Sequence, residues 1–136
     1  GAFARSLKDA PNVRALYDHD TRQVLGTTRA DTLQLREDAK GLSFELMLPD
    51  TSYARDLSAL VDRGDVAGCS FAFRVRPGGE SWEQRSGETV RVLSDIELAE
   101  ITITANPAYP DTEVALRSMS TARLSLNRLW MQTIWA

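Results

Sequence analysis

Apolar residues alternate with small or polar ones along much of this chain, and this period of two constrains the fold more than any other feature. The pattern is clearest over residues 66–75, where Cys69, Phe71 and Phe73 fall at every second position. Successive side chains on a β-strand point to opposite faces, so these three residues predict a strand with one core face.

Ser70 falls on the opposite face of that predicted strand, between a glycine at i−2 and an alanine at i+2. Two such small neighbours leave open space above the hydroxyl, which a nucleophile needs if a peptide carbonyl is to reach it. The same residues also fit an ordinary polar side chain on a half-exposed strand. The strand by itself therefore makes Ser70 a candidate nucleophile and no more.

Short alternating segments recur and predict a mainly β fold with helices, of the α+β class. Tyr53, Leu57 and Val61 instead follow helical spacing, which predicts a helix from about Thr51 to Arg63. One or two helical turns are also expected within residues 1–11, and a helical C-terminus from residue 111 onward. Further strands are predicted over residues 12–17, 23–26, 32–38, 41–48, 89–93 and 96–104. Seven or eight short antiparallel strands favour a barrel or sandwich over a βαβ sheet.

Composition sets the protein class. A chain of 136 residues fits one domain, and a net charge of −3 gives no basic surface for nucleic acid or an anionic membrane. No apolar run approaches the ~18 residues of a membrane span, and the single cysteine cannot form an intramolecular disulfide. We therefore expect neither a nucleic-acid nor a membrane partner. Because the chain begins with Gly1, we expect a processed or excised product.

Few residues can carry chemistry, which narrows the choice of mechanism. His19 is the only histidine, so a metal site with several histidine ligands is excluded, and we expect no metal or cofactor. Nucleophilic catalysis needs a hydroxyl or thiol, a base and a group that orients the base, and the base can only be His19. Ser70 and Cys69 compete as nucleophile. Because Cys69 shares the predicted core face, Ser70 is the better candidate.

The group that would orient His19 stays open at this point. The candidate acids are Asp18, Asp20, Glu97 and Glu100. The two aspartates adjoin His19 in sequence, which makes a good hydrogen bond to its ring awkward. Regular alternation over residues 96–104 places Glu100 on the face of Ile96 and Leu98, where an ionised carboxylate wants a partner. The same alternation places Glu97 on the other face.

Several blocks of the chain resemble the prohead (capsid maturation) proteases of tailed bacteriophages. The blocks stand in order and cover residues 1 to about 117. They include Gly-Ala-Phe-Ala-Arg-Ser-Leu at the start, Tyr-Asp-His-Asp around His19, Gly-Cys-Ser-Phe around Ser70 and Glu-Ile-Thr-Ile-Thr from Glu100. Further matching blocks lie at residues 24–26, 38–42, 48–51 and 106–112.

The resemblance implies a serine endopeptidase related in fold to the herpesvirus assemblins, an antiparallel β-barrel of about seven strands flanked by helices. It implies that Ser70 is the nucleophile, His19 the base and Glu100 the third member of the triad. It also implies that the substrates are the major capsid protein and the scaffolding protein, which such enzymes digest inside the assembling prohead, often with self-processing. The expected location is the bacterial host cytoplasm, with a phage or a prophage as the source. The alternative function is a non-catalytic barrel that binds capsid or scaffold protein.

The ends of the chain depart from this family pattern. Members of the family carry a further strand before the Gly-Ala-Phe block, so we expect an incomplete barrel or one completed by another subunit. Residues 1–117 are expected to form the protease barrel domain and residues 118–136 a helical tail. Leu126, Leu129, Trp130 and Trp135 in this tail form an apolar stripe that would pack on the barrel or on a second subunit, as in a homodimer.

Overall fold

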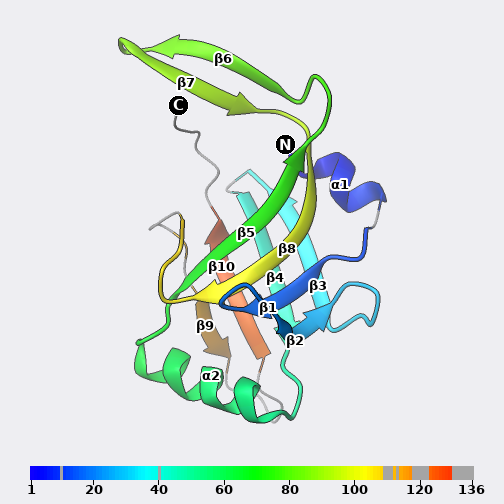
Figure 1. Cartoon of the computed structure of the whole chain (residues 1–136), viewed down its shortest axis with the longest axis vertical. Coiled ribbons are helices and arrows are strands. Elements are labelled where there is room, and N and C mark those ends of the chain that lie inside the picture. The colour runs from blue at the N-terminus through cyan, green and yellow to red at the C-terminus, as the bar shows by residue number, and fades with distance from the viewer. Residues whose placement is uncertain (10, 40, 109–111, 113, 118–122, 130–136) are drawn as a thin grey trace.

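The computed structural model describes the whole chain except residues 10, 40, 109–111, 113, 118–122 and 130–136 (Figure 1). Two helices and ten strands lie in the described part. In chain order they are α1 (Ala4–Asp9), β1 (Arg14–Tyr17), β2 (Asp20–Thr27), β3 (Leu33–Asp38), β4 (Gly41–Met47), α2 (Ser52–Arg63), β5 (Gly68–Val75), β6 (Glu80–Arg85), β7 (Glu88–Leu93), β8 (Ile96–Thr104), β9 (Val114–Arg117) and β10 (Arg123–Leu129).

The strands form two four-stranded sheets and a two-stranded ribbon. The first sheet has the order β2-β1-β8-β5, the second has the order β3-β4-β10-β9, and β6 pairs only with β7. In Figure 1 the first sheet lies in front of the second, α2 crosses one end and the ribbon extends from the other. The mainly β class with few helices is confirmed. The described pairings do not close the sheets into a barrel, so the predicted barrel is not confirmed, and β1 pairs with β8 in parallel where an antiparallel arrangement was expected.

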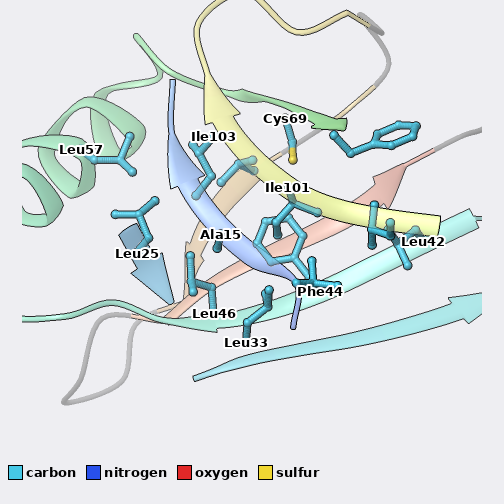
Figure 2. Packing of buried hydrophobic residues seen from close by; sticks show 14 of the residues in the cluster. Ala15, Leu25, Leu33, Leu42, Phe44, Leu46, Leu57, Cys69, Ile101 and Ile103 are labelled. Atoms are coloured by element: carbon cyan, nitrogen blue, oxygen red, sulfur yellow. The ribbon is translucent and has the colours of Figure 1, made fainter. Parts of the chain in front are cut away.

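The core fills the space between the two sheets (Figure 2). Ala15, Ile101 and Ile103 reach it from the first sheet, and Phe44 and Leu46 from the second; Phe44 is 2 % exposed and the others are fully buried. The alternation predicted for β5 is confirmed, because Cys69 and Phe71 belong to this core. The opposite face of the first sheet is here called the outer face.

Helix α2 begins and ends where the sequence indicates. The Thr51 hydroxyl accepts a hydrogen bond from the Ala54 amide at 3.3 Å, and Gly64 follows the helix with a left-handed φ of 83°. Both are preferred cap arrangements, since the hydroxyl satisfies an amide that has no partner within the helix and glycine adopts positive φ without strain. Leu57 is fully buried, so the helix covers one end of the core.

A β-bulge in β8 decides which face carries Glu100. The register pairs Ala72 of β5 with Glu100 but Phe73 with Leu98, so Ala99 is an extra residue on β8. Leu98 and Ile101 both lie in the core, while Ala99 is exposed. The expectation that Glu100 shares a face with Ile96 and Leu98 is therefore wrong. The extra residue shifts the alternation by one position and turns Glu100 to the outer face.

The helical C-terminus is wrong where the structure describes it, since β9 and β10 are strands. β10 lies between β4 and β9 and pairs antiparallel with both. Its sequence Arg-Leu-Ser-Leu-Asn also alternates with a period of two, and residues 123–126 pair with a strand on each side, which gives their backbone groups partners. Trp130 and Trp135 lie outside the described residues, and the division of the chain after residue 117 stays a prediction.

The bulge predicts a difference between two alanines of the first sheet. Ala99→Gln should change the free energy of unfolding by no more than about 0.5 kcal/mol, because the added side chain points to solvent. Ala15→Gln should destabilise the protein by at least ~2 kcal/mol, because it places a polar amide in the core. Urea unfolding followed by circular dichroism measures both. Equal destabilisation by the two variants would mean that β8 is regular and that Ala99 faces inward with Ile101.

Candidate active site

His19 lies in a tight turn between two strands of the first sheet. Asp18 and His19 are the only residues between β1 and β2, and both have positive φ, 51° and 58°. Two-residue hairpins favour turns with positive φ at both central positions, because their twist matches that of the strands. Asp and His tolerate this conformation better than most residues other than glycine. These two residues are called the His19 turn below, and the turn sets His19 at the end of β1, beside β8.

The imidazole of His19 contacts the carboxylate of Glu100 directly. His19 Nδ1 lies 2.7 Å from Glu100 Oε1, across 81 positions of sequence. The Glu100 side chain is 11 % exposed and the His19 side chain 50 % exposed. An ionised carboxylate can only accept hydrogen bonds, so a neutral ring in this contact donates from Nδ1 and leaves the Nε2 lone pair available as a base.

A second contact compensates the burial of the Glu100 carboxylate. Arg14 stands opposite Glu100 in the parallel β1–β8 pair, and its Nη2 lies 3.8 Å from Glu100 Oε2. Each carboxylate oxygen thus has a neighbouring nitrogen. Buried charges are tolerated when they are paired in this way.

The other candidate acids have different positions and partners. The Asp18 carboxylate accepts a hydrogen bond from Thr104 Oγ1 at 2.7 Å. Hydrogen bonds from the Arg22 side chain and amide hold the pKa of the Asp20 carboxyl below its usual range. Glu97 is exposed. Of the four acids considered from the sequence, Glu100 is the one that contacts the His19 ring.

Ser70 lies on the outer face, as Glu100 does, but on the adjacent strand β5 and two residues away from the position opposite Glu100. It stands directly opposite Thr102 of β8, and Ala72 stands opposite Glu100. Ser70 is only 5 % exposed, and its hydroxyl makes no hydrogen bond with another residue in the described part of the chain. The structure therefore brings His19 and Glu100 into contact. Ser70 lies in the neighbouring residue pair on this face of the β5–β8 ladder and makes no hydrogen bond to His19.

The open space predicted above Ser70 is not found on the Gly68 side. A Cβ added to Gly68 would lie 2.5 Å from Cγ of Pro107, so the proline ring packs against the glycine. Glycine is needed here for close approach of the loop after β8 rather than for substrate access. The low exposure of Ser70 agrees with a covered position, which corrects the expectation from the sequence.

Cys69 faces the opposite way from its neighbour. It is fully buried in the core, and burial raises the pKa of its thiol to about 12. The thiolate is the nucleophilic form of cysteine, and this environment disfavours it. The prediction that Cys69 lies on the core face is confirmed.

Three residues that contact His19, Asp18 or Glu100 were not predicted from the sequence to belong to the site. Arg14 approaches the Glu100 carboxylate, Thr102 Oγ1 accepts a hydrogen bond from the His19 amide at 2.8 Å, and Thr104 holds Asp18. The sequence contains a pattern that could have indicated two of them, because Thr102 and Thr104 alternate with isoleucines after Glu100. Polar residues at every second position of a buried strand indicate a second set of contacts on the outer face.

Metal-binding clusters and membrane-spanning helices were both sought in the described part of the chain. Within the described residues, no group of three or more histidine, cysteine or acidic side chains could hold a metal ion. Among the helices described, none has the length and apolar character needed to cross a membrane.

Comparison with known proteins identifies the family. The family model described as caudovirus prohead serine protease matches residues 1–125 of the 136 residues. Searches of curated proteins and of solved structures give no match. The family match includes His19, Ser70 and Glu100 within its range. Because it covers most of the sequence, the chain belongs to the caudovirus prohead serine protease family.

Proposed function

We propose that this protein is a serine endopeptidase of capsid maturation in which Ser70, His19 and Glu100 form the catalytic triad. The contact of 2.7 Å between His19 Nδ1 and Glu100 Oε1 is the observation that carries the proposal. A triad needs a base and an acid that orients the ring of that base, and His19 and Glu100 in this contact fit those two roles. Membership of a serine protease family supports the assignment of a serine as the nucleophile.

The position of Ser70 supports its role as nucleophile. Ser70 and Glu100 are diagonal neighbours on adjacent strands, since Ser70 pairs with Thr102. Diagonal neighbours on one face of a sheet have Cβ atoms roughly 7–8 Å apart. This separation leaves room for an imidazole ring between a carboxylate and a hydroxyl. Because Nδ1 contacts Glu100, Nε2 is the ring nitrogen that can accept the proton of Ser70. Catalytic hydrogen bonds often form only when the substrate binds.

The proposed reaction is acyl transfer to Ser70 followed by hydrolysis. His19 Nε2 takes the proton from Ser70 Oγ as the oxygen attacks the scissile carbonyl, and then gives that proton to the leaving amine. Glu100 holds the ring and stabilises the imidazolium that forms between these steps. A water molecule, deprotonated by the same ring, then releases the acyl group and restores Ser70.

The family description supports the choice of substrates. A prohead protease acts in the assembling capsid, so we propose the major capsid protein and the scaffolding protein as substrates, with the host cytoplasm as the place of assembly. Self-processing and a homodimer are further parts of the proposal. Both are open to mass measurement on the purified chain.

Replacing the nucleophile should abolish cleavage. Ser70→Ala removes the attacking oxygen, and loss of a triad member lowers the rate by about 10⁴- to 10⁶-fold. The assay is cleavage of a capsid–scaffold fusion protein, followed by gel electrophoresis. Ser81→Ala, an exposed serine on β6, is the matched control and should cleave normally. Undiminished cleavage by Ser70→Ala would reject Ser70 as the nucleophile.

Two glutamates of β8 should differ in their effect on activity. Glu100→Gln keeps the shape of the side chain but its amide no longer favours the ring tautomer that leaves Nε2 free, so we expect a loss on the order of 10³- to 10⁴-fold. Glu97→Gln, on the same face and exposed, should change the rate by less than about twofold. The rate of reaction with a fluorophosphonate probe measures both. Equal effects would mean that neither glutamate orients His19.

The thiol of Cys69 should be inert in the folded protein. With a pKa of about 12, the thiolate fraction at pH 8 is roughly 10⁻⁴, and it reaches about one half only near pH 12. Iodoacetamide at pH 8 should therefore leave the folded chain unmodified and alkylate it after denaturation, as measured by mass spectrometry. Rapid alkylation of the folded chain with parallel loss of activity would favour a cysteine hydrolase.

A further inference from the structure

The hydroxyl of Thr102 makes both of its hydrogen bonds to the hairpin that carries His19. Thr102 is fully buried on β8. Its Oγ1 accepts from the His19 amide at 2.8 Å and donates to the Leu16 carbonyl at 3.2 Å. A buried hydroxyl needs such partners, and here both belong to the β1–β2 hairpin.

The His19 turn is a conformation that needs support from its surroundings. Its two residues have φ of 51° and 58°, and residues other than glycine keep positive φ mainly where neighbouring groups fix them. β8 provides three such contacts. Thr102 bonds the His19 amide, the Ile103 carbonyl accepts from the Asp18 amide at 3.0 Å, and Thr104 Oγ1 donates to the Asp18 carboxylate at 2.7 Å.

Thr102 also neighbours both the His19–Glu100 pair and Ser70, which together form the proposed triad. Glu100, two positions earlier on the same face, bonds the His19 ring, while Thr102 bonds the His19 backbone. Across the sheet, Thr102 pairs directly with Ser70. Two residues of β8 thus bond His19: Glu100 bonds its ring and Thr102 bonds its backbone amide. Thr102 is also the residue of β8 that pairs with Ser70.

We propose that Thr102 is a positioning residue for His19, whose hydroxyl fixes the His19 turn so that the imidazole lies between Glu100 and Ser70. The proposal rests on the function proposed above. A ring attached to a loosely held turn would sample other positions, and misplacement of a catalytic group by about 1 Å can lower a rate on the order of 100-fold.

The test compares Thr102→Val with Thr102→Ser. Valine keeps the shape of threonine and removes both hydrogen bonds, so the rate of fluorophosphonate labelling should fall by about 10- to 100-fold. Serine keeps the hydroxyl and should restore most of that rate. His19 is the only histidine, so its ring nitrogens give one set of NMR signals in ¹⁵N-labelled protein. Those signals should move in Thr102→Val towards the values of an unrestrained histidine and stay in place in Thr102→Ser.

Thr112→Val is the matched control. Thr112 is also a buried threonine, and its hydroxyl accepts from the Cys69 amide at 2.9 Å and donates to the Cys69 carbonyl at 2.8 Å. Its loss should lower stability while leaving the His19 ring signals unmoved. Unmoved signals or an undiminished labelling rate in Thr102→Val would overturn the positioning role.

A measurement on the unaltered chain covers the case in which Thr102→Val does not fold. The His19 amide proton should exchange with solvent far more slowly than an unprotected amide, because it is bonded to a buried hydroxyl. Rapid exchange of this amide would overturn the proposal. A failure of the protease function has a different signature, namely an unaltered chain that keeps the protected amide and restrained ring but never reacts with the probe.

Discussion

The hydrogen bond between the His19 ring and Glu100 is the interaction on which the account of this protein depends. Its two partners are 81 positions apart in sequence, and three features bring them together. β1 lies beside β8 in parallel, the His19 turn ends β1 at the level of the site, and the bulge at Ala99 turns Glu100 outward. Without the bulge, the same strand would offer Glu100 to the core, where an ionised carboxylate would lack a partner.

The alternation of its strands places the core side chains of the first sheet on one face and the proposed catalytic side chains on the other. On the inner face, Cys69 and Ile101 contribute to the core between the sheets. On the outer face, Ser70, Thr102 and Glu100 occupy neighbouring positions of β5 and β8. Adjacent residues therefore point to opposite faces, which explains how a buried core thiol can precede the proposed nucleophile. Rigid strands are better supports for a catalytic arrangement than loops, because both their backbone and their neighbours are fixed.

Local sequence signals predicted those parts of the structure that depend on local interactions. The capped helix α2 and the outward direction of Ser70 follow from a few adjacent residues, and both were predicted correctly. The bulge could not be predicted, because an extra residue in a strand is visible only against its partner strand. The C-terminal strand β10 was missed for a related reason, since its pairing with β4 and β9 comes from distant parts of the chain. For the proposed site, His19 was the candidate base because it is the only histidine, whereas the preference for Glu100 among four acids needed the family resemblance and the contact seen in the structure.

The most direct test of the central claim is to locate the covalent adduct that a fluorophosphonate forms with the unaltered, folded chain. Proteolytic digestion and tandem mass spectrometry identify the modified residue without any substitution. We expect one adduct, on the oxygen of Ser70, because Ser70 is the proposed nucleophile and Glu100 orients the His19 ring that would deprotonate it. An adduct on another residue, or none on the folded chain, would contradict the proposed triad and would favour a capsid- or scaffold-binding role.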